Sequence, residues 1–96
     1  MLRWADALDH DRLAVSDVVQ TPGRLDDGTP LDYAWGMGVR TYAGHRAYRH
    51  GGSYADVRTM LVRVPEKGFD LVILALADHG CRYVTLTDSV LEALLA

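Results

Sequence analysis

The chain lacks the features that mark disulfide-stapled, nucleic-acid-binding or membrane-spanning proteins. Its 96 residues contain one cysteine, Cys81, which cannot form an intrachain disulfide. The net charge is −3 and no basic stripe with interleaved aromatics is present, so we expect neither nucleic acid nor an anionic membrane as a partner. The longest apolar run, residues 71–77, is too short for a membrane segment. The first residues carry no recognisable secretory signal, and the sequence leaves the localisation open.

What the chain does have is the composition of an ordinary globular domain. Hydrophobic residues make up 49% of the sequence, and no low-complexity tract or internal repeat interrupts them. We therefore interpret residues 1–96 as a single domain or as a fragment of one. A chain of this length buries only about two thirds of its unfolded surface, so its core is marginal without a partner.

Helical spacing is found at both ends of the sequence. Leu2, Ala5 and Leu8 predict a short amphipathic helix that stops at residues 9–11. Ser16 is typical of an N-cap for a further helical turn, which residues 21–23 end. Apolar residues between 86 and 95 predict a C-terminal helix, with Thr85 or Thr87 as its cap.

The middle of the chain favours strands. Residues 35–42 and 46–51 flank the short connection Ala43-Gly44 and predict a hairpin. Residues 56–64 predict a longer strand, which a Pro-Glu-Lys-Gly turn ends. Residues 69–77 are almost continuously apolar, which is typical of a strand covered on both faces and central in its sheet. The fold class predicted is α+β: an antiparallel sheet of three to four strands with N- and C-terminal helices packed on it.

One short stretch in this region carries chemistry. His50, Gly51, Gly52 and Ser53 place an imidazole and a hydroxyl beside backbone that has no side-chain bulk. Another molecule can approach such backbone closely and use its N–H and C=O groups. The plainer interpretation is that the two glycines make a bulge or a turn between strands.

The order of several elements around this stretch resembles a known family. These elements are the strand start "YAWGMGV" (33–39), "YRHGGS" (48–53), the turn "PEKG" (65–68) and the apolar strand that ends at Asp78. Together they resemble the C-terminal part of the serine β-lactamase and penicillin-binding-protein-like hydrolases, in the class C and esterase branch. The resemblance covers nearly all of the 96 residues, and it implies a partial β-lactamase-like fold. Asp78 stands where many relatives have asparagine.

The resemblance implies roles for four residues. His50 would be the basic residue of the third catalytic motif, and the backbone N–H of Ser53 would be one donor of the oxyanion hole. Gly51 and Gly52 would leave room for an acyl substrate. Independently of the resemblance, Tyr48 is two residues from His50 and so on the same strand face, where it would line the same cleft. Neither a cofactor nor a metal is implied.

The other two motifs of this family are absent from the chain. No serine is followed by lysine in the pattern S-x-x-K, because Ser16, Ser53 and Ser89 precede Val19, Asp56 and Glu92, and no asparagine is present for Y-x-N. We therefore expect the C-terminal segment of a serine hydrolase that is inactive alone. The chain would pair with a missing N-terminal part or form a homo-oligomer. The alternative is a non-enzymatic interaction module that self-associates through an exposed sheet edge.

Two further interpretations, a catalytic triad and a zinc site, are weaker. A triad of Ser53, His50 and Asp56 or Asp78 lacks the G-x-S-x-G elbow. The set His45, His50, His79 and Cys81 matches no zinc spacing. We interpret the arginines of the strands as a solvated face of the sheet, and an anion-binding role stays open for Arg49. These arginines are Arg40, Arg49, Arg58 and Arg63. We interpret the scattered aromatic residues as a cover for one sheet face.

Overall fold

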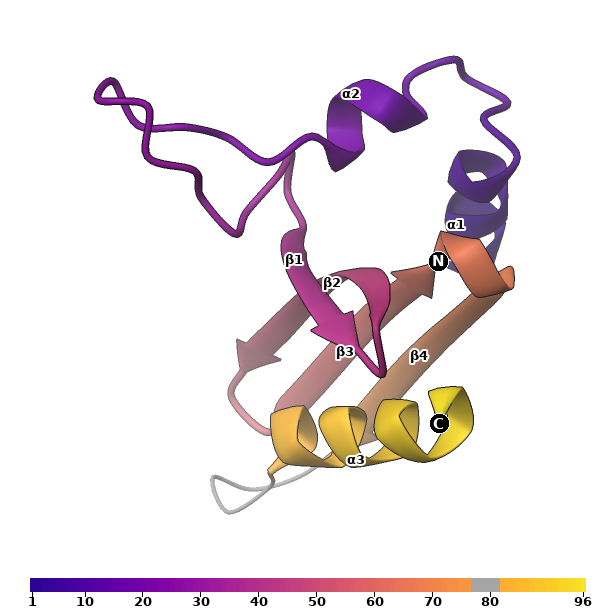
Figure 1. Cartoon of the computed structure of the whole chain (residues 1–96). Helices are drawn as coiled ribbons and strands as arrows, with labels where there is room; N and C mark the ends of the chain where they lie inside the picture. Colours follow the sequence, from indigo (N-terminus) through magenta and orange to yellow (C-terminus); the bar gives the residue numbers. More distant parts are fainter. Residues whose placement is uncertain (77–81) are drawn as a thin grey trace.

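The computed structural model describes residues 1–76 and 82–96. Its elements are helices α1 (Leu2–Asp9) and α2 (Ser16–Gln20), strands β1 (Gly38–Tyr42), β2 (His45–Tyr54) and β3 (Val57–Val64), the 3-10 turn η1 (Pro65–Lys67), strand β4 (Phe69–Leu76) and helix α3 (Tyr83–Leu95). Figure 1 shows the four strands side by side, with α1 and α2 at one end and α3 lying across the sheet.

The four strands form an antiparallel meander in the order β1-β2-β3-β4. Its first hairpin turns at Ala43 and Gly44, whose φ values are 48° and 82°, the left-handed conformation that two-residue hairpin loops require. The second turns at Ala55, with φ 49°, and Asp56. Sequence patterning predicted this α+β architecture and the first hairpin, and the structure confirms both.

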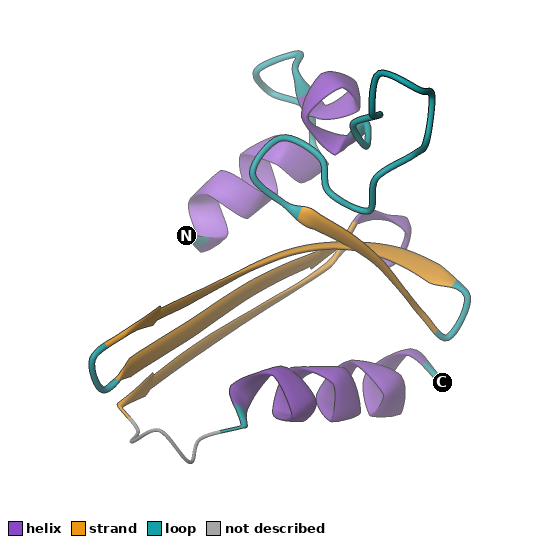
Figure 2. Cartoon of the chain, turned by 90° about the vertical axis from the view of Figure 1, so that its left-hand side faces the viewer, coloured by secondary structure: helices purple, strands orange, loops and turns teal. Residues whose placement is uncertain are grey.

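One face of the sheet and helix α3 form the main core. Figure 2 views the sheet nearly edge-on, with α3 below it. Met60, Val62 and Val64 alternate along β3 toward this helix, and Leu91 packs against them from α3, fully buried. This alternation follows from the two-residue period of a strand.

The opposite face is covered only in part. Helices α1 and α2 lie over the end of the sheet where Arg63 of β3 points toward them (Figure 2). The other end of this face carries exposed apolar side chains: Tyr54 (85%), Leu74 (70%) and Leu76 (88%). The prediction that β4 is central and covered on both faces is therefore wrong, because β4 is the edge strand of the four and none of its residues is fully buried. Its continuous apolar run would look the same whether or not another layer covered it.

The prediction of a solvated arginine face is wrong at two positions. Arg63 is 1% exposed, and its guanidinium donates to Asp9 Oδ1 at 2.6 and 2.9 Å and to Gln20 Oε1 at 2.9 Å. Arg58 is 6% exposed and donates to the carbonyls of Ala55 and Val57. The Asp9 carboxylate matches the charge of Arg63, whereas the two carbonyls satisfy hydrogen-bond donors of Arg58 without matching its charge.

Some local predictions also need correction. Val15, not Ser16, is the N-cap residue of α2, and the Ser16 hydroxyl donates instead to the carbonyl of Leu8. Thr85 and Thr87 lie inside α3, which begins at Tyr83. The aromatic residues divide between interior and surface: Tyr42 and Tyr48 are buried, while Trp4 and Trp35 are 52% and 71% exposed. None of the helices in residues 1–76 and 82–96 has the length and apolar character needed to cross a bilayer.

Candidate functional site

Part of strand β2 is an open edge of the sheet. β1 pairs with β2 only as far as Gly38 opposite Arg49, while β2 continues to Tyr54. Within the described residues, no strand pairs with residues 50–54 on that side. The His50-Gly51-Gly52-Ser53 stretch therefore lies at a margin of the sheet, on the part of β2 that extends beyond β1.

The register shows which backbone groups point out of this edge. The N–H of Val39 donates to the carbonyl of Asp32 at 2.8 Å, so it points away from β2. Val39 lies opposite Tyr48, and in an antiparallel pair the hydrogen-bonding direction alternates from residue to residue. It follows that the N–H and C=O groups of Gly51 and Ser53 point outward, and those of His50 and Gly52 point toward β3.

The two glycines make room for side chains of this same chain. A Cβ atom on Gly52 would lie 2.6 Å from Thr59 Oγ1, and one on Gly51 would lie 3.2 Å from Met60 Cε and 3.4 Å from the Tyr83 ring. A contact of 2.6 Å is far inside van der Waals distance, so glycine at position 52 has a packing reason besides any role toward a ligand. The outward backbone of Gly51 stays exposed.

His50 borders a hollow at this edge. The hollow measures about 310 Å³ and extends from His50 and Gly51 to Tyr33 in the loop before β1 and to Tyr83 at the start of α3. His50 is exposed, and its Nδ1 lies 3.4 Å from the hydroxyl of Tyr33, a long hydrogen bond. A proton donor or acceptor thus stands beside outward backbone N–H groups.

Sequence reasoning did not single out Tyr33 as a site residue. A tight turn brings it there: the N–H of Ala34 donates to the carbonyl of Met37 at 2.7 Å, Gly36 has φ 77°, and Tyr33 bridges Gly38. The pattern tyrosine, four residues, glycine at 33–38 was the available signal. It identifies Tyr33 only once the turn is known.

Arg49 also borders the hollow, but its charge is already matched. Its Nη1 donates to Asp88 Oδ1 at 2.9 Å and to the Tyr42 hydroxyl at 2.7 Å, and that hydroxyl donates to the same carboxylate oxygen. Burial, together with the hydrogen bond to Asp88, raises the pKa of Tyr42 to about 12. These contacts attach α3 to β1 and β2, so Arg49 serves the fold at this point.

The remaining residues named from the sequence are not brought together. Tyr48 shares the sheet face of His50 but is 7% exposed, with Arg63 6.0 Å above its ring, and borders separate hollows beside α2. Ser53 lies opposite Arg58 and His50 opposite Leu61, so the two side chains point to opposite faces. This arrangement gives no support to a triad of Ser53, His50 and Asp56.

The described residues give no support to a zinc site that includes His45 and His50. His45 Nδ1 lies 3.0 Å from Glu66 Oε2, an ion pair across the ends of β2 and β3 when the imidazole is protonated. No group of three metal-ligating side chains occurs in residues 1–76 and 82–96. Asp78, His79 and Cys81 lie outside the described residues.

No family model, no curated protein and no solved structure matches this chain. The site combines an exposed imidazole near a tyrosine hydroxyl, two outward backbone N–H groups, and a hollow between strand β2 and helix α3.

Proposed function

We propose that this chain is the C-terminal part of a β-lactamase-like serine hydrolase, in which the open edge of β2 forms half of an acyl-binding cleft. The observation that carries the proposal is the outward direction of the Gly51 and Ser53 backbone groups beside His50. An extended acyl substrate can pair with such an edge as an added strand does. The motifs of residues 33–39, 48–53 and 65–68 support the same assignment.

Each residue has a defined task in this cleft. The Ser53 N–H donates to the carbonyl oxygen of the substrate as negative charge develops there during attack. His50 supplies an imidazole that can donate or accept a hydrogen bond, and Tyr33 orients its ring through Nδ1. The attacking serine and its lysine belong to polypeptide outside these residues, since no S-x-x-K is present. The chain alone is therefore expected to be catalytically silent.

The test begins with the coding sequence upstream of Met1. The proposal predicts an S-x-x-K motif and a Y-x-N or S-x-N motif in the same reading frame, and their absence would refute it. In the continuous protein, Ser53→Pro removes the outward N–H without breaking a ladder hydrogen bond. We expect kcat to fall about 100- to 1,000-fold, the effect of losing one oxyanion donor. Ser53→Ala, which keeps the N–H, is the matched control and should retain activity.

A second assay tests the silence of the isolated chain. The purified 96 residues should hydrolyse neither a chromogenic cephalosporin nor a p-nitrophenyl ester above the buffer rate. Hydrolysis that His50→Ala abolishes would contradict this expectation, because it would mean that a nucleophile exists within the chain.

The free edge of β4 favours a second function, a module that self-associates by strand addition. The β3–β4 register places the N–H groups of Val72, Leu74 and Leu76 away from β3, by the same alternation as in β2. Leu74 and Leu76 are also 70% and 88% exposed, and no strand of residues 1–76 and 82–96 pairs with this side of β4. Long exposed edges of this kind pair with other strands.

Sedimentation velocity across a concentration series tests this second function. We expect a dimer or larger oligomer that Leu74→Pro dissociates, because proline removes an outward N–H without breaking the β3–β4 ladder. Leu74→Ala, which keeps the N–H, should weaken association less. A monomer at high concentration would rule the module out.

A further inference from the structure

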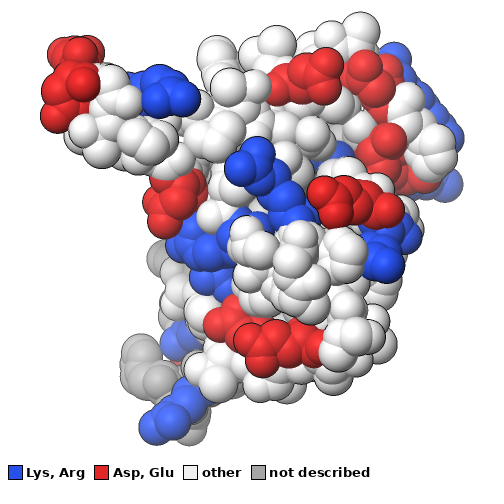
Figure 3. Space-filling model, in the orientation of Figure 1, with Lys and Arg blue, Asp and Glu red and all other residues white. Residues whose placement is uncertain are grey.

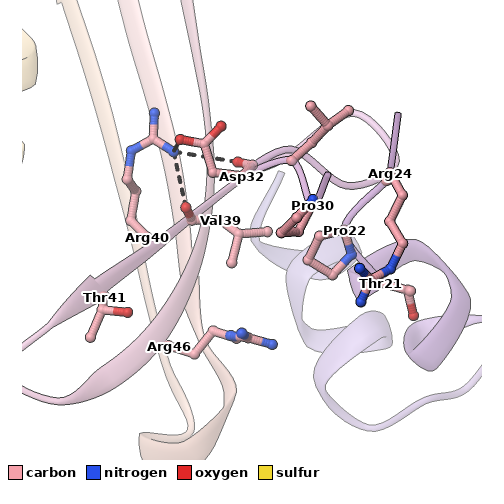
Figure 4. Close-up of a pocket in the computed structure, with 11 residues that line it drawn as sticks. Thr21, Pro22, Arg24, Pro30, Asp32, Val39, Arg40, Thr41 and Arg46 are labelled. Carbon is pink, nitrogen blue, oxygen red and sulfur yellow. Dashed lines mark hydrogen bonds and ion pairs between the residues drawn. The ribbon is translucent and has the colours of Figure 1, made fainter. Parts of the chain in front are cut away.

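A second hollow lies away from the proposed acyl cleft. It measures about 610 Å³ and is enclosed by residues 21–24, residues 30–32, the outer side of β1 and Arg46 of β2. Figure 4 shows side chains from these four parts of the chain around it. In the surface view, basic atoms lie across the middle of this face, below the projecting loop (Figure 3).

Three arginines border the hollow, and their charges are not equally matched. Arg40 Nη1 lies 3.4 Å from Asp32 Oδ2 and donates to the carbonyl of Val39 at 2.9 Å. Arg24 Nη1 donates only to a neutral group, the Gly28 carbonyl at 3.1 Å. Arg46 makes no hydrogen bond or ion pair with any residue of the described ranges. Figure 4 shows the Arg24 head beside Pro22 and Thr21, and the Arg46 side chain extending from β2 toward the same region.

The lining of this hollow is mixed: polar side chains, among them Thr21, Asp32 and Thr41, share it with a group of apolar ones. Pro22, Pro30 and Val39 belong to the apolar group, two of them rigid rings with no side-chain entropy to lose on binding. Two unmatched guanidinium groups beside these apolar side chains complement a ligand with a negative head and an apolar body. Guanidinium matches a carboxylate particularly well, because its planar N–H groups can donate two parallel hydrogen bonds.

We propose that this hollow binds a small carboxylate with an apolar body, such as an aryl carboxylate, through Arg24 and Arg46. The carboxylate lies between the two guanidinium groups and the apolar body rests on Pro22, Pro30 and Val39. The site does not depend on the acyl cleft, since neither His50 nor the outward edge of β2 borders it.

Titration of the 96-residue chain with benzoate, followed by the amide chemical shifts of Val39 and Thr41, tests this proposal. We expect saturable shifts, with affinity that falls as ionic strength rises. Benzamide, which has the same ring but no charge, and acetate, which has the charge but no ring, should each bind at least about tenfold more weakly. Arg46→Gln and Arg24→Gln should each lower the benzoate affinity about tenfold, the effect of losing a charge-assisted hydrogen bond.

Arg3→Gln is the matched control, because Arg3 is an exposed arginine on α1 and does not border the hollow. It should leave benzoate binding unchanged, and thermal melting should show that all three variants remain folded. The proposal is overturned if benzoate causes no saturable shift, or if benzamide or acetate binds as tightly as benzoate. It is also overturned if the Arg46→Gln and Arg24→Gln variants bind benzoate with the affinity of the original chain.

Discussion

Replacing Gly52 with alanine tests why a glycine stands at this position in β2. Its ideal Cβ would lie 2.6 Å from Thr59 Oγ1 on β3, whereas the next nearest atom, Thr59 Cβ, is 3.9 Å away. The clash thus comes from one hydroxyl oxygen. Removing that oxygen with Thr59→Ala should make room for the methyl group.

The expected size of the effect follows from two opposing contributions. Overpacking a tight contact costs about 1–3 kcal/mol. Alanine also restricts the unfolded chain relative to glycine, which stabilises the fold by about 0.4–1 kcal/mol. Gly52→Ala should therefore lower the free energy of unfolding by about 1 kcal/mol, which corresponds to a fall of about 5 °C in Tm for a domain of this size.

Urea denaturation of the two single variants and the double variant measures this coupling. We expect the free energy of unfolding of the double variant, Gly52→Ala with Thr59→Ala, to exceed the value predicted from the two single effects by at least about 1 kcal/mol. Gly51→Ala is a useful comparison, because its closest contact is the flexible end of Met60 at 3.2 Å, so its effect should be smaller. An unchanged stability for Gly52→Ala, or purely additive effects, would refute this packing role for Gly52.

The buried charges beneath α1 give two further predictions. Burial and the neighbouring Asp9 carboxylate raise the pKa of Asp70 to about 7, so its ionisation disfavours the fold and stability should fall as pH rises from about 4 to 7. Asp70→Asn should flatten this dependence in urea midpoints, and an unaltered pH profile would contradict the assignment. Arg63→Met leaves the carboxylates of Asp9 and Asp70 without their cation, so it should lower the free energy of unfolding by about 3–5 kcal/mol at pH 7. Arg3→Met, at an exposed position, should lower it by less than about 0.5 kcal/mol. Thermal melting of the two variants measures the difference.

The sheet could be predicted from the sequence because its signals are local. Two-residue turns, a Pro-Glu-Lys-Gly turn and short apolar strands force neighbouring strands to pair in order. What covers the sheet, by contrast, has no local signal in the sequence. An apolar run such as residues 69–77 indicates that a strand favours burial, but nothing in it tells whether a covering layer exists.

Buried charge was missed for a related reason. Arg63 looks like any strand arginine in the sequence, and its partners Asp9 and Gln20 lie 54 and 43 residues away. No short-range pattern links these positions. Only the packing of α1 and α2 on the sheet brings the carboxylate and the amide to the guanidinium.

The segment that forms the candidate site could be chosen from the sequence, but the direction of its backbone N–H groups could not. The imidazole and glycines at 50–52 identified the segment. Which N–H groups face outward depends on the β1–β2 register and on the bond from Val39 to Asp32, which the residue types do not encode. Tyr33 joins the site only through the turn at Gly36.

Amide hydrogen exchange along β2, measured by NMR, tests directly whether the backbone at this edge is open. We expect the amides of Gly51 and Ser53 to exchange far faster than those of His50 and Gly52, which donate to β3. Equal protection at all four positions would contradict this expectation, because the edge would then be closed and no backbone donor would be free to receive an acyl group.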